Sequence, residues 1–340
     1  MTRRRDKIHG GVGGRIDRGA LVVSLDLELL WGYHDVGITD VARGQCDGAR
    51  AAVGRLLDLF ERHQVSATWA IVGHLYLDRA ERDAQGKAHP RHPRPLYPWL
   101  RGDWFDALPA GDASSCPEWY GRDLVEMIQQ ARPPQEIGCH TFSHVIFGDP
   151  GCDRAVAKAE LERSVELARA AGIHLKTMVF PRNQVGHLPA LREAGMEVFR
   201  GRDVEPLPWM PNAFRDGANV LARILSVPPA PVLPHRTPEG LINLPGSMFY
   251  MAATDWQRFV PMAVRTVVVK RGLREAARRK AIFHLRLHPE GLVFGAARLF
   301  AGLEDIFEEA TRLRHAETLQ ILPMYQAAVQ YLGDDSTRPQ

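Results

Sequence analysis

The sequence predicts an α/β protein whose strands and helices form a closed or nearly closed β/α barrel. Short apolar runs alternate with stretches of helical periodicity, which is typical of a largely parallel sheet covered by helices. The chain has 340 residues, enough for one large barrel or two medium domains. Seven apolar runs are predicted as strands, and this number of units favours the single barrel. They lie near residues 20–28, 66–73, 135–140, 175–181, 197–200, 241–245 and 281–288.

Helical periodicity fills the segments between these runs. The first such pattern covers residues 47–63, where apolar residues such as Val53, Leu56 and Phe60 recur at helical spacing. Further helices are predicted at residues 155–171, 189–195, 256–280 and 296–313. The short helix at 189–195 ends on Gly195, which suits a left-handed cap.

We expect one catalytic barrel domain over residues 19–335. A leader, residues 1–18, is rich in Gly and Arg and poor in apolar side chains, so we expect it to be disordered. Two stretches, residues 77–120 and 206–238, are rich in Pro and show no clear periodic element between their ends. We interpret them as insertions, because long loops in a compact domain usually serve as lids or substrate walls.

Composition excludes several classes of function. The chain has 43 basic and 40 acidic residues, a net charge of +3, so no broad nucleic-acid surface is expected. The sequence contains no run of 18 apolar residues, so no membrane span is predicted. The leader lacks the apolar core of a signal peptide, and the four cysteines form no regular framework. These features favour a cytoplasmic protein with reduced thiols.

Two carboxylates and two histidines stand at the ends of predicted strands. Asp26 and Glu28 end the first strand, and residues two apart on a strand face the same side. Two carboxylates in one pocket repel each other unless a cation lies beside them. His140 and His144, four residues apart, follow the third predicted strand. Because active sites of β/α barrels gather at the carboxyl ends of the strands, this set predicts a metal site, although a solvated strand end and a hydrogen-bonded turn are the simpler alternatives.

Five segments together resemble the motifs of the NodB-homology polysaccharide deacetylases. The stretch Glu136-Ile137-Gly138-Cys139-His140-Thr141-Phe142-Ser143-His144 resembles the family's metal-binding motif. Ser24-Leu25-Asp26 resembles the start of its first motif, and residues 67–73 resemble its second strand. Phe180-Pro181-Arg182 and Leu287-His288-Pro289 stand where the family has an arginine motif and its last histidine. The five segments occur in the family's order and span residues 20–290.

The resemblance implies a distorted β/α barrel that removes acyl groups from N-acylated sugars with the help of one divalent metal ion. By this resemblance Asp26 is the general base, and His140 and His144 are metal ligands. Arg182 would orient Asp26, and His288 would be the general acid. Zinc is the default metal for such a site, and cobalt, nickel or iron also suit its ligands.

The sequence departs from the family pattern in three places. Leu27 replaces the second aspartate of the first motif, so we assign its ligand role to Glu28; the opposite assignment, with Asp26 on the metal and Glu28 as base, stays open. Arg286 stands where the family places a leucine that lines the acetyl pocket, which favours an anionic or larger group there. The arginine motif reads Pro181-Arg182-Asn183-Gln184 instead of the usual Arg-x-Pro.

Three further side chains are candidates for substrate binding. Trp31 follows the carboxylate strand and could stack on a sugar face, or it packs the first loop. Asn183 could donate to a carbonyl oxygen, or it is a turn residue. Arg286 alternates with His284 and His288 on the last predicted strand, and we expect the deeper His284 to be buried and hydrogen-bonded.

The predicted function is therefore metal-dependent N-deacetylation of an amino sugar. A cytoplasmic protein would act on a soluble, nucleotide-linked, lipid-linked or metabolite-linked glycan. One alternative is an amidohydrolase for another C–N bond, such as a formamide, cyclic imide or ureide. The other is a non-catalytic glycan-binding protein on the same barrel. The sequence gives no indication of oligomeric state.

Overall fold

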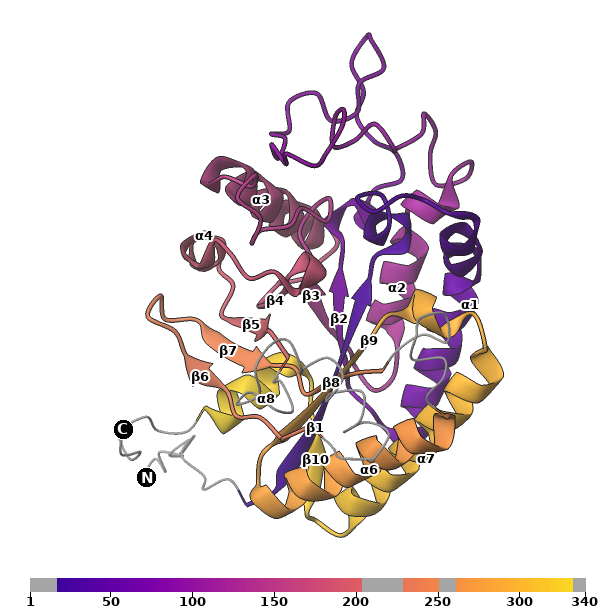
Figure 1. Ribbon diagram of the computed structural model, residues 1–340, viewed down its shortest axis with the longest axis vertical. Helices are drawn as coiled ribbons and strands as arrows, with labels where there is room; N and C mark the ends of the chain where they lie inside the picture. The colour runs from indigo at the N-terminus through magenta and orange to yellow at the C-terminus, as the bar shows by residue number, and fades with distance from the viewer. Residues whose placement is uncertain (1–16, 204–228, 251–260, 333–340) are drawn as a thin grey trace, which may run out of the picture.

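A computed structural model of the chain describes residues 17–203, 229–250 and 261–332 (Figure 1). The predicted disordered leader lies almost wholly outside the described residues, as does most of the second predicted insertion, 206–238. Within the described ranges, ten strands form one curled sheet in the order β6-β7-β5-β4-β3-β2-β1-β9-β8, and β10 lies beside β1. All neighbouring strands are parallel except β6 and β7. The expected β/α barrel is confirmed as a curled, parallel-dominated half-barrel.

All seven predicted strands are present, and three short ones were not predicted. The predicted strands are β1 (Gly19–Leu27), β2 (Thr68–Ile71), β3 (Glu136–Cys139), β4 (Thr177–Val179), β5 (Val198–Gly201), β7 (Ile242–Pro245) and β9 (Ile282–Leu287). The others are β6 (His235–Arg236), β8 (Met248–Phe249) and β10 (Leu319–Ile321). β6 and β8 have only two residues, too few to show a two-residue period in the sequence.

β1 is the strand on which the sheet is built. β9 pairs with it over Ala20–Leu25, while β10 and β2 pair with its first and second halves. At the other end of the sheet, Val232 precedes β6 and exchanges two backbone hydrogen bonds with Ile282 of β9. The sheet therefore curls far enough for the chain near its β6 edge to reach β9.

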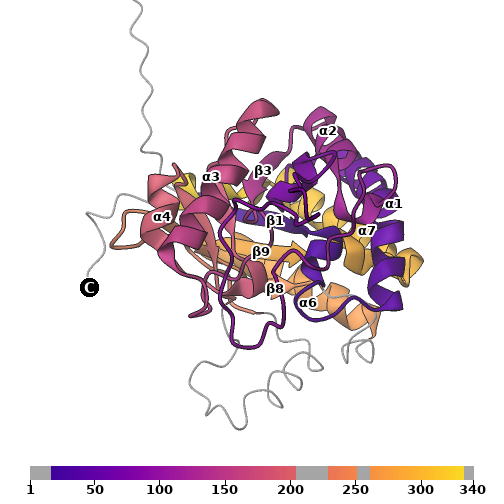
Figure 2. The ribbon, with the colours of Figure 1, turned by 90° about the horizontal axis from the view of Figure 1, so that it is seen from above.

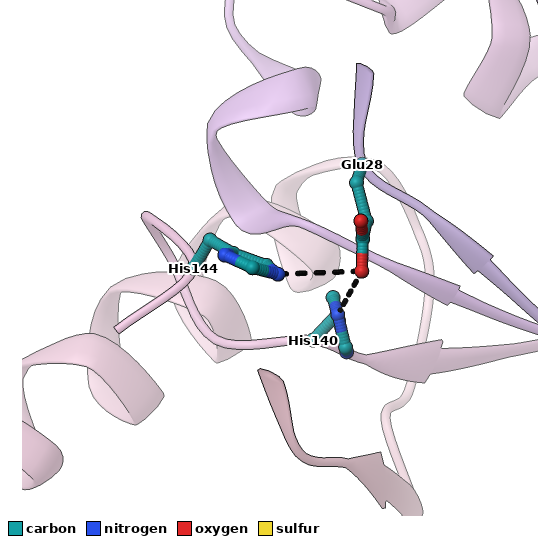
Figure 3. Close-up of side chains that lie close together, drawn as sticks. All are labelled: Glu28, His140 and His144. Atoms are coloured by element: carbon teal, nitrogen blue, oxygen red, sulfur yellow. Dashed lines mark hydrogen bonds and ion pairs between the residues drawn. The ribbon is translucent and has the colours of Figure 1, made fainter. Parts of the chain in front are cut away.

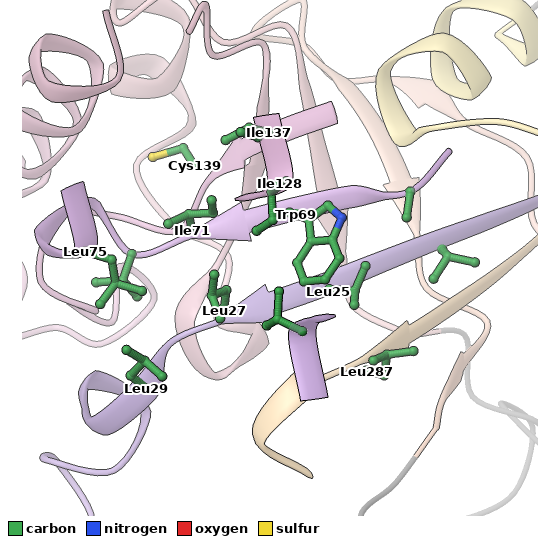
Figure 4. Packing of buried hydrophobic residues seen from close by; sticks show 14 of the residues in the cluster. Leu25, Leu27, Leu29, Trp69, Ile71, Leu75, Ile128, Ile137, Cys139 and Leu287 are labelled. Atoms are coloured by element: carbon green, nitrogen blue, oxygen red, sulfur yellow. The ribbon is translucent and has the colours of Figure 1, made fainter. Parts of the chain in front are cut away.

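The alternation of β1 divides its side chains between two cores. Leu21, Leu25 and their alternating neighbours pack against the outer helices (Figure 4). Ala20 and Val22 face the inner side and pack in a second cluster with residues of α8 (Met324–Tyr331). The inner side continues with Ser24 and then Asp26. The interior of the half-barrel is thus apolar at the amino end of β1 and polar at its carboxyl end.

Helices cover the outside of the sheet (Figures 1 and 2). They are α1 (Asp40–His63), α2 (Arg122–Gln130), α3 (Arg154–Ala170), α4 (Leu188–Glu193), α6 (Met262–Arg279) and α7 (Ala296–His315). α1 begins seven residues before its predicted start, because the Thr39 hydroxyl accepts a hydrogen bond from the Ala42 amide and caps the helix there. Gly195, with φ +85°, confirms the predicted left-handed end of α4.

The segment predicted as the first insertion, residues 77–120, contains no α-helix or extended strand. It holds the 3₁₀ turn η3 (Pro117–Trp119) and the isolated bridges Arg79–Asp112 and Arg82–Ala88. In Figure 1 this segment lies at the top, beyond the carboxyl ends of β1 and β2. No helix in the described ranges has the length and apolar character required to cross a bilayer.

Candidate active site

Glu28, His140 and His144 converge at the carboxyl ends of β1 and β3 (Figure 3). Glu28 follows β1 directly, and His140 follows β3. Glu28 Oε1 lies 2.9 Å from His140 Nε2 and 3.3 Å from His144 Nε2. All three residues are buried. The structure therefore brings together the three predicted metal ligands.

The hydrogen bonds of His140 indicate that this cluster fits a cation. Nδ1 of His140 lies 2.8 Å from the carbonyl oxygen of Val179, which can only accept, so Nδ1 carries the proton. In the neutral ring the lone pair of Nε2 then faces the Glu28 carboxylate. Two acceptors at this distance need a proton or a cation between them. A carboxylate and two imidazoles are a ligand set that divalent zinc accepts, and the Val179 carbonyl supplies the outer hydrogen bond typical of a metal-bound histidine.

The loop that carries His144 is held in an unusual conformation by several contacts. Thr141 and His144 have positive φ angles of 58° and 64°. Between them, Ser143 donates its amide and its hydroxyl to the buried carboxylate of Glu160, at 2.8 and 2.7 Å. The Trp104 indole donates to Ser143 as well. Left-handed residues cost free energy and persist only where surrounding contacts hold them. The contacts of Ser143 therefore stabilise the loop conformation that directs His144 toward Glu28.

Gly32 leaves room for the Glu28 carboxylate. A Cβ atom at Gly32 would lie 2.0 Å from Glu28 Oε2, far inside van der Waals contact. Gly32 ends the 3₁₀ turn η1 (Leu29–Gly32), which follows Glu28 directly. Any larger residue at this position would displace the carboxylate from His140 and His144.

Asp26 forms a buried ion pair with Arg200. Arg200, on β5, donates to both carboxylate oxygens of Asp26 at 2.7 and 2.6 Å, and its side chain is not exposed. Burial opposes ionisation of Asp26, but the Arg200 guanidinium outweighs it and lowers the pKa of Asp26 to about 2. Asp26 is therefore ionised at neutral pH.

The expectation that Arg182 orients Asp26 is corrected by this arrangement. Arg182 instead donates to Asp35 and to the carbonyl oxygen of Gly32. It lies in the 3₁₀ turn after β4 with φ 56°, which directs its side chain toward the loop after β1. Arg200 was missed, although an arginine at the end of a buried apolar strand was a signal that could have found it.

A chain of hydrogen bonds supports Arg200 from the inner side of the sheet. Arg200 donates to the Ser24 hydroxyl at 3.0 Å, and that hydroxyl lies 2.8 Å from His284 Nε2. His284 Nδ1 lies 3.0 Å from the Pro245 carbonyl oxygen, so Nδ1 donates and Nε2 accepts from Ser24. Burial lowers the pKa of His284 to about 3, which keeps it neutral. His284 is buried and hydrogen-bonded, as predicted.

His288 lies beside both carboxylates. Its Nε2 is 3.4 Å from Glu28 Oε1 and 3.6 Å from Asp26 Oδ2, and its side chain is 27% exposed. Burial disfavours the charged ring, but the Glu28 and Asp26 carboxylates outweigh it and raise the pKa of His288 above its ordinary value. The predicted convergence of Asp26 and Glu28 into one pocket is thus confirmed, and the His288 ring lies within reach of both.

The three predicted substrate-binding residues are engaged by the protein itself. Trp31 is fully buried and donates to the Trp119 carbonyl, so it packs the first loop and offers no face to a sugar. Asn183 Oδ1 accepts from Arg200 at 3.2 Å.

Arg286 is likewise engaged by residues of the protein. It donates to both oxygens of Asp203 at 2.7 to 2.9 Å, and its guanidinium lies 4.5 Å above the Phe249 ring. Of the two expectations for Arg286, an anionic or a larger group beside it, the anionic group is Asp203 of the protein itself, which neutralises the charge of Arg286.

Replacing Arg200 tests the buried pair. Arg200→Met should lower the free energy of unfolding by about 3–5 kcal/mol at pH 7, because it leaves the Asp26 carboxylate buried and unpaired. Arg182→Met should cost less than Arg200→Met, since the Arg182 side chain is 33% exposed and water can replace it beside the buried Asp35 carboxylate. Urea denaturation measures both, and a larger loss for Arg182→Met would contradict the assignment.

The contribution of the Asp26–Arg200 pair to the stability of the fold depends on pH. In the wild type the pKa of Asp26 lies below its ordinary value of 3.8, so the pair stabilises the fold above that pH and this contribution is lost as pH falls toward about 2. In Arg200→Met, only His288 and His140 oppose the effect of burial on the pKa of Asp26, so the loss of stability on acidification should shrink.

Gly32→Ala should weaken zinc binding at least tenfold, because the added methyl group displaces the Glu28 carboxylate. Gly54→Ala is the matched control, since a Cβ at Gly54 in α1 meets nothing within 4 Å. Competition with a chromophoric chelator measures both affinities. Equal affinities for the two variants would show that Glu28 is not a ligand.

The comparisons with family models and with solved structures both match polysaccharide deacetylases. A family model described as polysaccharide deacetylase matches residues 47–198, a stretch that includes His140 and His144 but ends before Arg200. A solved structure from Mycobacterium smegmatis, assigned to the polysaccharide deacetylases, aligns with 95% of this chain and 96% of its own, at 15% identity and a TM-score of 0.61.

A structure from Pseudomonas aeruginosa PAO1 with the same assignment aligns with 97% of this chain and 98% of its own, at 14% identity and a TM-score of 0.55. At these identities the two structures show a shared fold. No curated protein matches the sequence. The resemblance predicted from the sequence is nevertheless confirmed: residues 47–198 match the family model described as polysaccharide deacetylase.

Proposed function

We propose that this protein is a metal-dependent hydrolase that removes the acetyl group from an N-acetylated amino sugar. The observation that carries the proposal is the convergence of Glu28, His140 and His144 beside the Asp26–Arg200 pair and His288. A metal-ligand set, a base and an acid in one pocket are the parts that amide hydrolysis requires. The family match and the shared fold support the same chemistry.

Glu28, His140 and His144 would hold one divalent ion, with zinc the default. When bound, the ion would polarise the amide carbonyl and lower the pKa of water. The geometry favours Glu28 over Asp26 as the carboxylate ligand, because both oxygens of Asp26 are taken by Arg200. The alternative with Asp26 on the metal would require that pair to open.

Asp26 and His288 would share the proton transfers. Asp26 is ionised, so its carboxylate can accept a proton from the attacking water as the water oxygen bonds to the carbonyl carbon. The raised pKa of His288 favours the imidazolium, which can donate its Nε2 proton to the nitrogen as the C–N bond breaks. The products are acetate and the free amino sugar.

The pairing of Arg286 favours a sugar amide over a different amide substrate. Arg286, in place of the family's leucine, was one feature in favour of the alternative amidohydrolases, and Arg286 is paired with Asp203. Deacetylation of a sugar is therefore preferred over hydrolysis of a formamide, cyclic imide or ureide. The sugar and its carrier are to be found by screening.

The purified protein should contain about one metal ion per chain and release acetate from at least one member of a panel of N-acetylated mono- and oligosaccharides. A chelator should abolish the release, and zinc or cobalt should restore it. His140→Ala and His144→Ala should lose both the ion and the activity while remaining folded. His174→Ala is the control, because His174 is exposed and lies before β4, at the opposite end of the sheet.

Three outcomes would contradict the proposal. Sugar binding that no chelator affects, without acetate release, would favour the glycan-binding alternative. Formate release or ring opening without acetate would favour the other amidohydrolases. Acetate release that survives in His140→Ala would exclude the proposed metal site.

A further inference from the structure

Glu290 is a buried carboxyl group that lies behind the candidate metal ligand Glu28. It belongs to the 3₁₀ turn η6 (Pro289–Leu292), two residues after His288, and is 2% exposed. Its Oε1 accepts from the Leu29 amide at 2.7 Å and from the Glu28 amide at 3.2 Å. The contact joins residues more than 260 positions apart in the sequence, and it holds the backbone of a proposed ligand.

The two amides that Glu290 accepts from lie where the chain leaves the sheet. The parallel ladder between β1 and β2 ends at Leu27, and no other backbone or side-chain acceptor for the Glu28 and Leu29 amides occurs among the described residues. Buried amides without an acceptor are costly, so this turn needs a side-chain partner. Glu290 supplies one oxygen to both.

The same turn contains an uncommon backbone conformation. Leu29 has φ 49°, in the left-handed region that residues with a Cβ rarely adopt. Such a residue costs about 1–3 kcal/mol and persists only where its surroundings hold it. The turn at Leu29 is what lets the Glu28 carboxylate pack against Gly32 and face His140. Glu290 therefore stabilises the conformation on which the position of Glu28 depends.

Glu290 has no other visible task in the described part of the structure. Its second oxygen, Oε2, is buried and has no hydrogen-bond partner there. It is not among the residues whose ligand atoms cluster closely enough to share an ion. A carboxyl group buried at this cost, with one oxygen hydrogen-bonded to the Glu28–Leu29 turn and the other without a partner, is best explained by what it does to that turn.

We propose that Glu290 is a positioning residue that holds the Glu28–Leu29 turn in the conformation that binds metal. This inference rests on the proposed function, in which Glu28 is a metal ligand. It requires an acceptor oxygen at position 290, and it does not require Glu290 to contact the metal or the sugar.

The test compares zinc affinities of purified, folded variants by competition with a chromophoric chelator. Glu290→Ala removes the acceptor and should weaken zinc binding about 10- to 100-fold, the range typical for loss of an outer partner of a metal ligand. Glu290→Gln keeps an acceptor oxygen and should stay within about threefold of the wild type. If Glu290→Ala fails to fold, Glu290→Asp takes its place in the test. The Asp side chain is one methylene shorter, so its zinc affinity should be weaker than that of the wild type but by less than about tenfold.

Glu309→Ala is the matched control for general destabilisation. Glu309 is also a buried glutamate, but it pairs with Arg274 and Arg312 on the outer helices. Its replacement should lower the denaturation midpoint and leave zinc affinity unchanged. The comparison separates an effect on the turn from an effect on overall stability.

Different results would overturn different parts of the account. Wild-type affinity in Glu290→Ala would overturn the positioning role while leaving the metal site intact. An equal loss in Glu290→Gln and Glu290→Ala would show that the charge matters and not the acceptor geometry, and would overturn it too. If the wild-type protein itself binds no zinc or cobalt, the metal site fails, and the role of Glu290 fails with it.

Discussion

One carboxylate oxygen, Glu28 Oε1, is the atom around which the site is arranged. The Nε2 atoms of His140, His144 and His288 lie 2.9, 3.3 and 3.4 Å from it. These groups follow β1, β3 and β9, whose carboxyl ends lie close together within four neighbouring strands of the sheet. A buried carboxylate among imidazoles is stable only with positive charge nearby, which a bound cation or a protonated ring provides.

The neighbouring Asp26–Arg200 pair constrains the chemistry in a different way. Because Arg200 takes both oxygens of Asp26, the pocket contains one carboxylate directed at the histidines and one held ionised beside them. This division gives the two acidic groups different environments and therefore different tasks. It arises from the two-residue period of β1, which places Ser24 and Asp26 on the inner side of the half-barrel, with Glu28 following at the same end of the strand.

Sequence patterns predicted the elements and residues that depend on local spacing. The seven predicted strands, the pairing of His140 with His144 and the convergence of Asp26 with Glu28 follow from periodicity and from strand ends meeting at one edge of the sheet. Partners that depend on how distant turns are oriented could not be predicted. Arg182 binds Asp35 because of a left-handed turn after β4, and that conformation is invisible in the motif.

The partners of Trp31 and Arg286 could not be predicted from the sequence either. Trp31 has neighbours in the long insertion that bury it completely, while the sequence showed only an aromatic residue after a carboxylate strand. Arg286 forms an ion pair with Asp203. In each case the decisive partner lies far away in the chain, and a single sequence does not indicate which long-range pair forms.

The most direct test of the account is the position of the metal in crystals of zinc- or cobalt-loaded protein, located by anomalous diffraction at the metal edge. The account predicts one strong peak within bonding distance of Glu28 Oε1, His140 Nε2 and His144 Nε2, with the Asp26–Arg200 pair intact. A peak bound by Asp26 with Arg200 displaced would reverse the roles of the two carboxylates. A peak between His34, Asp35 and His144, the other group in the described residues that lies around His144, would contradict the proposed site itself.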